Sequence, residues 1–451
     1  MNDCLNFNSK LTVQADKRMN NKTVKKLWNS FCFGDITLDI KSVDDCIFRL
    51  GDTKLPDLND GKEYALRVDK NGAAIVGKDY GGLMRGFISL LMKIECADSG
   101  FIIKPVTEQS NYKIKNRMIH ICVFPENDLY FIKKLIRLAG LCQYTHIVIE
   151  FWGMLKYDCL KELAWPHAFS KEQVKELICE CSEFGIEPIP MFNQLGHATA
   201  CRIINGKHVV LDQNPRLQHL FTPDGWAWNI HSDKTRTLLK NIRGELYALF
   251  GDGTYMHIGC DEAYYYTRCD EERKKLPDFL KYLTDEVVKE GRRPMVWMDM
   301  MLERDKYNKK VRAYATCAPD EVEIMQSALN PATVMVDWQY NMKEAPIETM
   351  LSLKDNIRDA MGAPWYEPDN YAAYVDTVTE HQMFGIMMTT WHTLYQHMHS
   401  ILGCAKKCGA VTFPWSQFSG LREETATLFR RVSFEGNTYT DSGWAKHQIE
   451  V

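Results

Sequence analysis

Short apolar stretches alternate with longer amphipathic ones from about residue 113 onward. Helices are predicted between the apolar stretches, for example over Asp128–Gln143 and from Ser170, where Gln173 completes a capping box, through Phe184. Eight stretches have the length and composition of buried parallel strands: Arg117–Val123, His146–Phe151, Pro188–Phe192, Tyr255–Cys260, Pro294–Trp297, Val334–Trp338, Arg358–Ala363 and Phe384–Thr390. Eight strand–helix units predict an α/β fold, a closed (β/α)₈ TIM barrel.

The first part of the chain has a different pattern. Glu63–Val68 alternates as a strand, and a turn separates it from a second strand at Ala73–Val76, which predicts a hairpin. Tyr80–Ile94 then has apolar residues at helical spacing. We therefore predict a small α+β domain at 1–112, the barrel at 113–395, and the last barrel helix with a C-terminal helical extension at 396–451.

Composition narrows the class of protein. The length of 451 residues suits a barrel of roughly 250 residues with a smaller companion domain. The formal net charge of −4, without a long basic run, gives no indication of nucleic acid or anionic membranes as partners. No apolar run approaches the ~20 residues that span a bilayer. The first residues lack the charged and apolar regions of a signal peptide, so we expect a cytoplasmic protein.

Cysteine and histidine spacing gives no indication of a metal site. The fifteen cysteines are odd in number and scattered through core segments, which favours reduced, buried thiols over disulfides. Pairs such as Cys404 and Cys408 lack the spacing of zinc ligands. His392, His397 and His399 are close in sequence, but without the i, i+4 spacing of a helical metal grip, so a structural role is expected. We expect neither a metal nor a cofactor.

Two adjacent carboxylates follow the fourth predicted strand. Tyr255–Cys260 is apolar and ends on Asp261 and Glu262. Neighbouring strand residues point to opposite faces, so both acids can serve one site only if the strand ends there. In a barrel this point is the carboxyl end, where catalytic residues lie. The alternative is an acidic loop, which the three following tyrosines make less favourable.

Polar and aromatic residues also follow the other strands. Any one tryptophan is more often core than ligand platform, but tryptophans at successive strand ends are harder to explain by packing. Aromatic faces stack on sugar rings while carboxylates bind hydroxyls, so this combination favours a carbohydrate site. The aromatic residues are Trp297, Trp338, Tyr340, Trp365, Tyr366 and Trp391.

The motif H-x-G-x-D-E at His257–Glu262 resembles the signature of glycoside hydrolase family 20, the β-N-acetylhexosaminidases. Lys115–His120 is similar to the family's first barrel strand, and Pro188–His197 to its third-strand segment ending in Gly-His. Ala363–Tyr366 is similar to the family's Trp-Tyr stretch, and Glu63–Ile94 to its small α+β domain. The resemblance covers most of residues 60–395.

The resemblance implies a retaining exo-β-N-acetylhexosaminidase acting on oligosaccharides or glycoconjugates with a terminal 2-acetamido sugar. In that family the substrate's acetamido oxygen is the nucleophile and forms an oxazolinium intermediate. Glu262 would be the general acid and then the base, and Asp261 would bind the acetamido N–H. Further implied substrate-binding residues are Arg117, His197, Trp297, Trp338, Tyr340, Trp365, Tyr366, Asp369 and Trp391. Among these, Tyr366 would donate to the acetamido carbonyl, Arg117 would bind hydroxyls of the non-reducing end, and Trp297, Trp338 and Trp391 would wall the pocket.

Arg117 has a structural alternative, a salt bridge at the barrel mouth. The chain also departs from the family pattern where acids are common: Cys122, Asn193, Thr393 and Pro368 stand there instead, although Asp369 follows Pro368. The last two positions would contact the 4- and 6-hydroxyls, so sugar preference is open. Two alternatives follow: a hydrolase for a modified 2-acetamido sugar, and a non-catalytic sugar-binding protein on the same scaffold. Whether the C-terminal extension makes a homodimer is also open.

Overall fold

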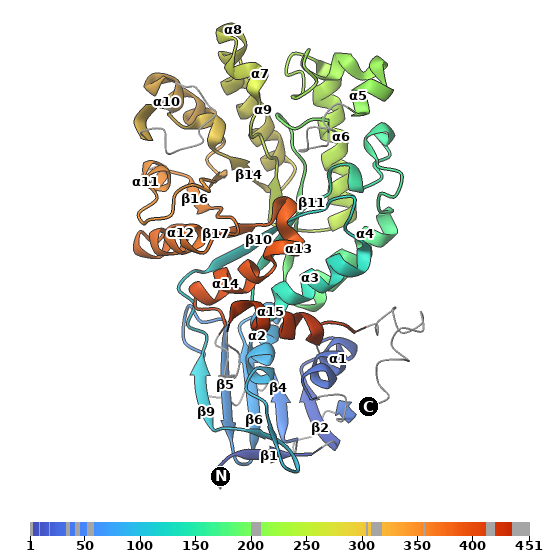
Figure 1. Cartoon of the computed structure of the whole chain (residues 1–451), viewed down its shortest axis with the longest axis vertical. Coiled ribbons are helices and arrows are strands. Elements are labelled where there is room, and N and C mark those ends of the chain that lie inside the picture. The colour runs from blue at the N-terminus through green and yellow to red at the C-terminus, as the bar shows by residue number, and fades with distance from the viewer. Residues whose placement is uncertain are drawn as a thin grey trace.

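The predicted strands form a closed barrel of eight parallel strands in the computed structural model (Figure 1). The structure describes residues 3–8, 10–17, 19–32, 37–40, 46–51, 58–199, 209–303, 305–307, 318–354, 357–411 and 420–434. The barrel strands are β10 (Asn116–Cys122), β11 (His146–Glu150), β12 (Glu187–Met191), β13 (Tyr255–His257), β14 (Arg293–Trp297), β15 (Val334–Asp337), β16 (Asp359–Gly362) and β17 (Gly385–Thr389). They follow chain order around the barrel, and β17 pairs with β10. The predicted fold class is confirmed.

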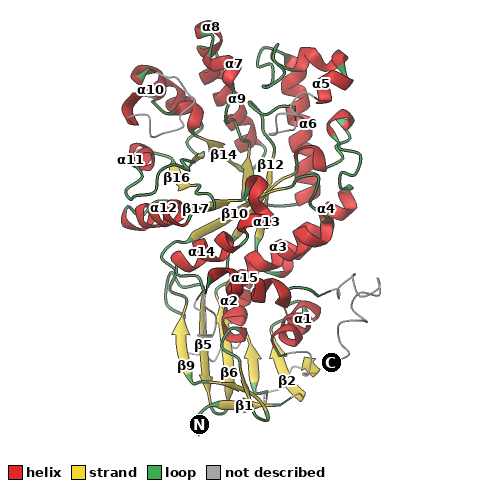
Figure 2. Ribbon diagram, in the orientation of Figure 1, coloured by secondary structure: helices red, strands yellow, loops and turns green. Residues whose placement is uncertain are grey.

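Helices surround these strands, as the colouring of Figure 2 shows. The longer ones after successive strands are α3 (Leu129–Leu141), α4 (Lys171–Glu183), α6 (Asp233–Phe250), α9 (Leu276–Lys289), α10 (Pro319–Ala328), α11 (Glu348–Lys354), α12 (Pro368–Glu380) and α14 (His399–Lys407). Shorter ones are η1 (Trp152–Met154), η2 (Lys161–Leu163), α5 (Val209–Gln213), η3 (Pro215–Leu220), α7 (Tyr264–Thr267), α8 (Asp270–Arg273), η4 (Asp299–Met301), η5 (Asp305–Tyr307), η6 (Trp391–Thr393) and α13 (Leu394–His397). The capping box expected at Ser170 and Gln173 opens α4.

Alternation along each strand separates the barrel interior from the helix-facing layer. In β10, Met118 and Cys122 belong to the cluster of buried side chains inside the barrel. Ile119 and Ile121 belong to the larger core that the helices cover. Because side chains alternate with a period of two, every residue of β10 is assigned to one of these two layers.

The N-terminal region forms its own sheets. Its strands are β1 (Leu5–Phe7), β2 (Lys10–Ala15), β3 (Thr37–Ile40), β4 (Phe48–Leu50), β5 (Tyr64–Asp69), β6 (Gly72–Gly77), β7 (Glu95–Ala97), β8 (Gly100–Ile103) and β9 (Val106–Gln109). Six of them form a sheet in the order β3-β2-β4-β6-β5-β9, and β1-β8-β7 form a second one. The predicted hairpin is confirmed, since β5 and β6 pair antiparallel with Asp69 opposite Gly72.

Helices lie between this domain and the barrel. In Figure 1 the N-terminal sheet lies at one end of the long axis, with α1 (Asn21–Phe31) and α2 (Tyr80–Leu91) on its barrel side. The C-terminal helix α15 (Leu421–Arg431) contacts α1, α3 and α14, and thereby joins the two parts. Among the described residues, no helix combines the length and apolar character needed to cross a bilayer, and the described cysteines are free thiols.

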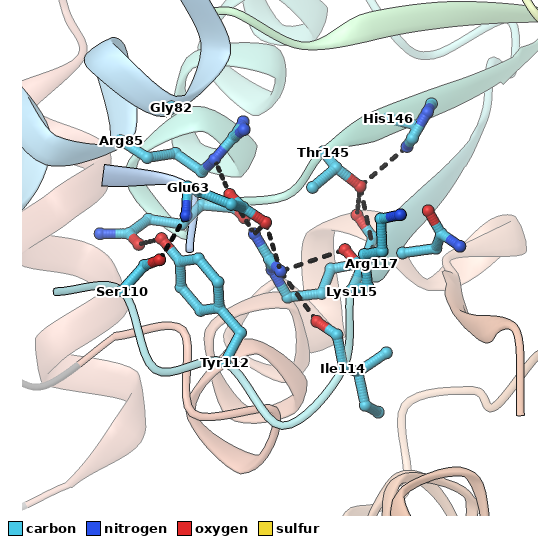
Figure 3. Close-up of polar contacts among 12 residues, drawn as sticks. Glu63, Gly82, Arg85, Ser110, Tyr112, Ile114, Lys115, Arg117, Thr145 and His146 are labelled. Carbon is cyan, nitrogen blue, oxygen red and sulfur yellow. Dashed lines mark hydrogen bonds and ion pairs between the residues drawn. The ribbon is translucent and has the colours of Figure 1, made fainter. Parts of the chain in front are cut away.

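Arg117 lies at this junction, and the expectation that it binds sugar hydroxyls is wrong. Its guanidinium contacts the Glu63 carboxylate of the N-terminal domain at 3.2 Å (Figure 3). It also donates to the carbonyl oxygens of Ile114, Lys115 and Gln143. The side chain is 1% exposed, so all of its charge is compensated inside the protein.

Two features of β10 explain this placement. Arg117 is the second residue of the strand, so it lies at the amino end of the barrel, whereas the expected site lies at the carboxyl end. Arg117 also lies two and four residues from Ile119 and Ile121, so its side chain is on the same side of the strand as theirs, which faces the helices. Arg85 of α2 binds the same Glu63 carboxylate (Figure 3), so one carboxylate pairs with two arginines at the junction.

Replacing Arg117 should therefore lower stability and not substrate binding. We expect Arg117→Met to lower the free energy of unfolding by about 3–5 kcal/mol, because it breaks a buried ion pair and leaves three carbonyls without their donor. The KM for the 2-acetamido sugar expected from the sequence should stay within about twofold of wild type. Urea denaturation and steady-state kinetics measure the two quantities.

Arg67 offers a matched control for this prediction. It pairs with Asp69 at 3.4 Å, but both side chains are about half exposed, at 54% and 42%. Arg67→Met should cost no more than about 1 kcal/mol. A large rise in KM for Arg117→Met at unchanged stability would return Arg117 to the substrate site.

A buried carboxyl stands at the end of β15. Asp337 accepts hydrogen bonds from the hydroxyls of Thr349 at 2.7 Å and Tyr374 at 2.9 Å. Burial nevertheless raises the pKa of Asp337 to about 6. An unfolded aspartate titrates near pH ~3.9, so the native state favours the protonated form. Asp337 therefore lowers the free energy of unfolding as the pH rises from about 4 to about 6, and this destabilisation is constant above that range.

We expect Asp337→Asn to remove this pH dependence, because the asparagine oxygen still accepts both hydroxyls but carries no charge. The stability of the variant relative to wild type should improve by about 3 kcal/mol between pH 4 and pH 7. Urea denaturation of both proteins across this range measures the difference. A constant difference would show that Asp337 does not titrate there.

Candidate active site

Polar and aromatic side chains from six barrel strands meet at the carboxyl end of the barrel. His197 follows β12, and the Asp261–Glu262 pair follows β13. The aromatic residues come from the next four strands, with Trp297 ending β14 and Trp338, Trp365 and Trp391 after β15, β16 and β17. This is the end of the barrel at which the sequence places the site.

The chain leaves β13 earlier than predicted. The strand was expected to reach Cys260 but ends at His257. Gly259, Cys260 and Glu262 then have positive φ angles of 65°, 79° and 51°. A residue with a Cβ rarely adopts this region, so the turn is a strained one of the kind that clusters at functional sites. It allows consecutive carboxylates to serve one site.

Two glycines bring neighbouring connections together at this turn. A Cβ on Gly196 would lie 1.9 Å from the carbonyl oxygen of Asp261, and one on Gly259 would lie 1.5 Å from Oδ1 of Asn193. Both positions therefore require glycine, which accounts for the Leu-Gly-His and His-Ile-Gly sequences. The connections after β12 and β13 pack backbone to backbone.

His197 contacts both members of the acid pair. Its Nε2 atom lies 3.0 Å from Oε2 of Glu262 and 3.4 Å from Oδ2 of Asp261. The imidazole is buried, with the Trp226 ring centroid at 4.4 Å and the Trp152 ring stacked at 5.9 Å. His197, Asp261 and Glu262 are also a group whose ligand atoms lie within 4.8 Å of one another, close enough to hold a metal ion.

Asp299 supports the acid pair from the fifth strand. One of its carboxylate oxygens accepts the Glu262 backbone N–H at 2.9 Å, and the other accepts the Trp338 indole N–H at 3.2 Å. Burial raises the pKa of Asp299 well above its ordinary value, and the charges of Asp261 and Glu262 raise it further. Asp299 thus connects the backbone of the expected acid to one aromatic wall.

The aromatic residues form a continuous set. Trp297 is fully buried, and its ring centroid lies 5.8 Å from that of Trp391. The Trp391 indole donates to the Tyr340 hydroxyl at 2.7 Å. Tyr340 in turn packs between Trp338 at 5.2 Å and Trp365 at 5.1 Å. These five side chains constitute the aromatic wall.

Two expected residues lie outside this wall. The Tyr366 ring stacks on His397 at 4.0 Å and meets Trp365 edge-on at 4.6 Å. Asp369 is exposed in the first turn of α12, where an acid favours the helix dipole. The tyrosine inside the aromatic wall is Tyr340.

A buried polar network lies beneath the site. The Glu150 carboxylate is fully buried, with one oxygen 3.0 Å from Nε2 of His120 and the other accepting from the Asn193 side-chain amide at 2.9 Å. The His120 ring lies 4.5 Å from that of Trp391. The network thus connects β10, β11 and the β12 connection to the aromatic wall.

Trp152 and Asp299 lie at strand ends in the predicted barrel, but sequence reasoning assigned neither of them a role in the site, and it did not single out Trp226. The Trp226 indole donates to the Glu262 carbonyl oxygen at 2.5 Å, from the long connection between β12 and β13. No periodic pattern in that connection marks this residue. Asp299, by contrast, stands two residues after Trp297, and its position at a strand end is a signal that could have identified it.

Comparisons with known proteins identify a family for this barrel. Residues 153–401 match the family described as "Glycosyl hydrolase family 20, catalytic domain". A curated relative, the beta-hexosaminidase of Porphyromonas gingivalis (strain ATCC BAA-308 / W83), is 23% identical over 319 residues, which are 64% of this chain and 39% of the relative. The matched region thus spans about two fifths of that relative's length.

Solved structures share the fold. The GH20 exo beta-N-acetylglucosaminidase of Vibrio harveyi, in complex with N-acetylglucosamine, aligns with a TM-score of 0.65 at 14% identity, over 95% of this chain and 73% of that one. The GH20 beta-N-acetylhexosaminidase of Streptomyces coelicolor A3(2) aligns with a TM-score of 0.68 at 15% identity, over 94% and 91%. At this identity the likeness is one of fold.

Proposed function

The chain belongs to glycosyl hydrolase family 20, and we propose that it is a retaining exo-β-N-acetylhexosaminidase that removes terminal β-linked GlcNAc or GalNAc. The observation that supports this most strongly is the pair Asp261 and Glu262, which both lie within reach of His197. Asp299 connects the pair to the aromatic wall. Exo-action rests on the relative from Vibrio harveyi, whose name describes an exo enzyme.

In this proposal the two carboxylates have different tasks. Glu262, the more exposed of the two at 20%, protonates the leaving oxygen and later activates water. Asp261, at 3%, accepts the acetamido N–H and stabilises the charge that develops as the carbonyl oxygen attacks the anomeric carbon. The burial of Asp261 strengthens this electrostatic effect. In the second step water attacks the anomeric carbon, the bond between that carbon and the acetamido oxygen breaks, and the Glu262 carboxylate accepts the proton of the water.

His197 and Asp299 position the acid. The His197 imidazole lies against the Glu262 carboxylate, and Asp299 binds the Glu262 backbone. The left-handed backbone of His197, with φ of 53°, and that of Glu262 restrict both side chains further. A positioned acid of this kind is worth roughly 10²–10⁴ in rate.

The tyrosine that binds the acetamido carbonyl is Tyr340 in this proposal, and not Tyr366 as the family resemblance implies. Tyr340 lies inside the aromatic wall, and its hydroxyl is held by the Trp391 indole. Tyr366 instead packs on His397.

A second candidate is a hydrolase for a 2-acetamido sugar modified at its 4- or 6-hydroxyl. Thr393 stands where an acid is common, and its hydroxyl accepts the Trp365 indole N–H at 3.0 Å. This position therefore supports the aromatic wall and offers no carboxylate to a sugar hydroxyl. Relative kcat/KM for plain and 6-O-substituted 2-acetamido glycosides separates the two candidates.

The acid pair provides the direct test of the proposal. We expect Glu262→Gln to lower kcat on a substrate with a poor leaving group by about 10²–10⁴. Asp261→Asn should lower kcat by more than it raises KM, since the amide still contacts the substrate but brings no charge. Substrates with a fluorinated acetamido group should react progressively more slowly with wild type, because fluorine withdraws electrons from the nucleophilic oxygen.

Glu323, exposed in α10, is the control. Glu323→Gln should behave as wild type on 4-nitrophenyl β-GlcNAc and β-GalNAc. Cleavage of a plain β-glucoside as fast as the 2-acetamido sugar, or rates that do not change with fluorination, would contradict substrate assistance. An inactive wild type would favour the sugar-binding alternative.

Removing single hydroxyls separates the two tyrosines. Tyr340→Phe should lower kcat by about 100-fold, the cost of one donor to a developing charge, while Tyr366→Phe changes it by no more than about twofold. The two variants remove the same atom from neighbouring strand ends, so each is the control of the other. The opposite ranking would restore Tyr366 as the donor.

A further inference from the structure

We propose that His197, Asp261 and Glu262 bind a zinc-type divalent cation, which inhibits the enzyme reversibly. The three side chains offer one imidazole nitrogen and two carboxylate oxygens within 4.8 Å of one another. The proposed reaction does not need the cation. The inhibition rests on the proposed function, because the cation occupies Glu262, the proposed general acid.

Two edges of the ligand triangle already match zinc coordination. Zinc bonds to nitrogen and carboxylate oxygen are ~2.0–2.2 Å long, so adjacent ligand atoms are ~3.0 Å apart in an octahedron and ~3.4 Å apart in a tetrahedron. Nε2 of His197 lies 3.0 Å from Oε2 of Glu262 and 3.4 Å from Oδ2 of Asp261. The third edge, between the two carboxylate oxygens, is no longer than 4.8 Å.

The ligands are held in place by their surroundings. Trp226 packs on the His197 ring and donates to the Glu262 carbonyl, and Gly196 packs on the Asp261 carbonyl. Ordering the ligands therefore costs little on binding. Three protein ligands is also the number found in zinc sites that keep a fourth position for water or substrate.

The donor set selects the kind of cation. Imidazole with carboxylates suits Zn²⁺ and Co²⁺, whereas Mg²⁺ and Ca²⁺ prefer oxygen ligands. The cation takes the lone pair of His197 Nε2 and displaces a proton from that nitrogen or from the carboxyl groups. Glu262 then cannot carry the proton that the leaving oxygen requires.

Binding is measured on the full chain, freed of metal with EDTA and of any affinity tag. Calorimetry with ZnCl₂ should show one site per chain, and CoCl₂ should produce visible absorption bands of a four- or five-coordinate site. Zinc should inhibit hydrolysis of 4-nitrophenyl β-GlcNAc, EDTA should restore the rate, and MgCl₂ at the same concentration should have no effect.

His231 supplies the matched control. Its Nε2 atom lies 2.6 Å from Glu272, but the side chain is half exposed, and no third ligand accompanies the pair within the part of the chain that the structure describes. Replacing a residue that only hydrogen-bonds to a metal ligand lowers metal affinity by about 10–100-fold. Because His197→Asn removes a ligand itself, we expect it to lower zinc affinity by about 100-fold or more. His231→Asn should bind zinc as wild type does. Glu262→Gln, which keeps the side-chain shape, should also have a lower affinity for zinc. This variant tests the proposal even if His197→Asn fails to fold.

Unchanged zinc affinity in a folded His197→Asn or Glu262→Gln would overturn the proposal, as would an active wild type without zinc binding by calorimetry. Zinc binding with loss in these variants, in a wild type without hydrolase activity, would instead support the metal site and contradict the proposed function. The two proposals therefore fail in distinguishable ways.

Discussion

Adjacent residues of a strand point in opposite directions, yet the site requires two adjacent carboxylates side by side. The chain meets this constraint by ending β13 at His257 and continuing through three residues with positive φ. The turn is held by the close packing of Gly196 on the Asp261 carbonyl, where a single methyl group would lie at 1.9 Å. Each connection therefore determines the shape of the other, and His197 and the acid pair are positioned by the same contact.

The two ends of the barrel have different tasks. At the amino end, Arg117 and Arg85 share Glu63 and hold the N-terminal domain. At the carboxyl end the strands terminate in the acids and the aromatic wall. The five residue-to-residue steps from Arg117 to Cys122 span ~16 Å of extended chain, too far for one side chain to serve both ends. Stability at the amino end and chemistry at the carboxyl end is the usual division in this fold.

The fold was predictable because the pattern of each strand is local, and all eight predicted strands are present. The position of a residue along its strand was harder to use. Arg117 was correctly predicted to lie in a strand. However, its side chain is on the helix-facing side of that strand and far from the carboxyl end of the barrel, so it cannot bind the substrate there. Trp226 and the Glu150 network depend on contacts between distant segments, which no single stretch of sequence contains. The choice between Tyr340 and Tyr366 likewise depends on which ring turns inward.

The distribution of charge links the proposed reaction to the proposed inhibition. Asp261, Glu262 and Asp299 lie together, and the pKa of Asp299 is raised by burial and by the charges of the other two. Such a site favours any positive charge placed within it, since a cation relieves the repulsion between the carboxylates. An oxazolinium-like transition state satisfies this requirement briefly during each turnover. A zinc ion satisfies it with a permanent charge and with the same atoms. Susceptibility to zinc therefore follows from the electrostatic property that makes the site suitable for substrate-assisted cleavage.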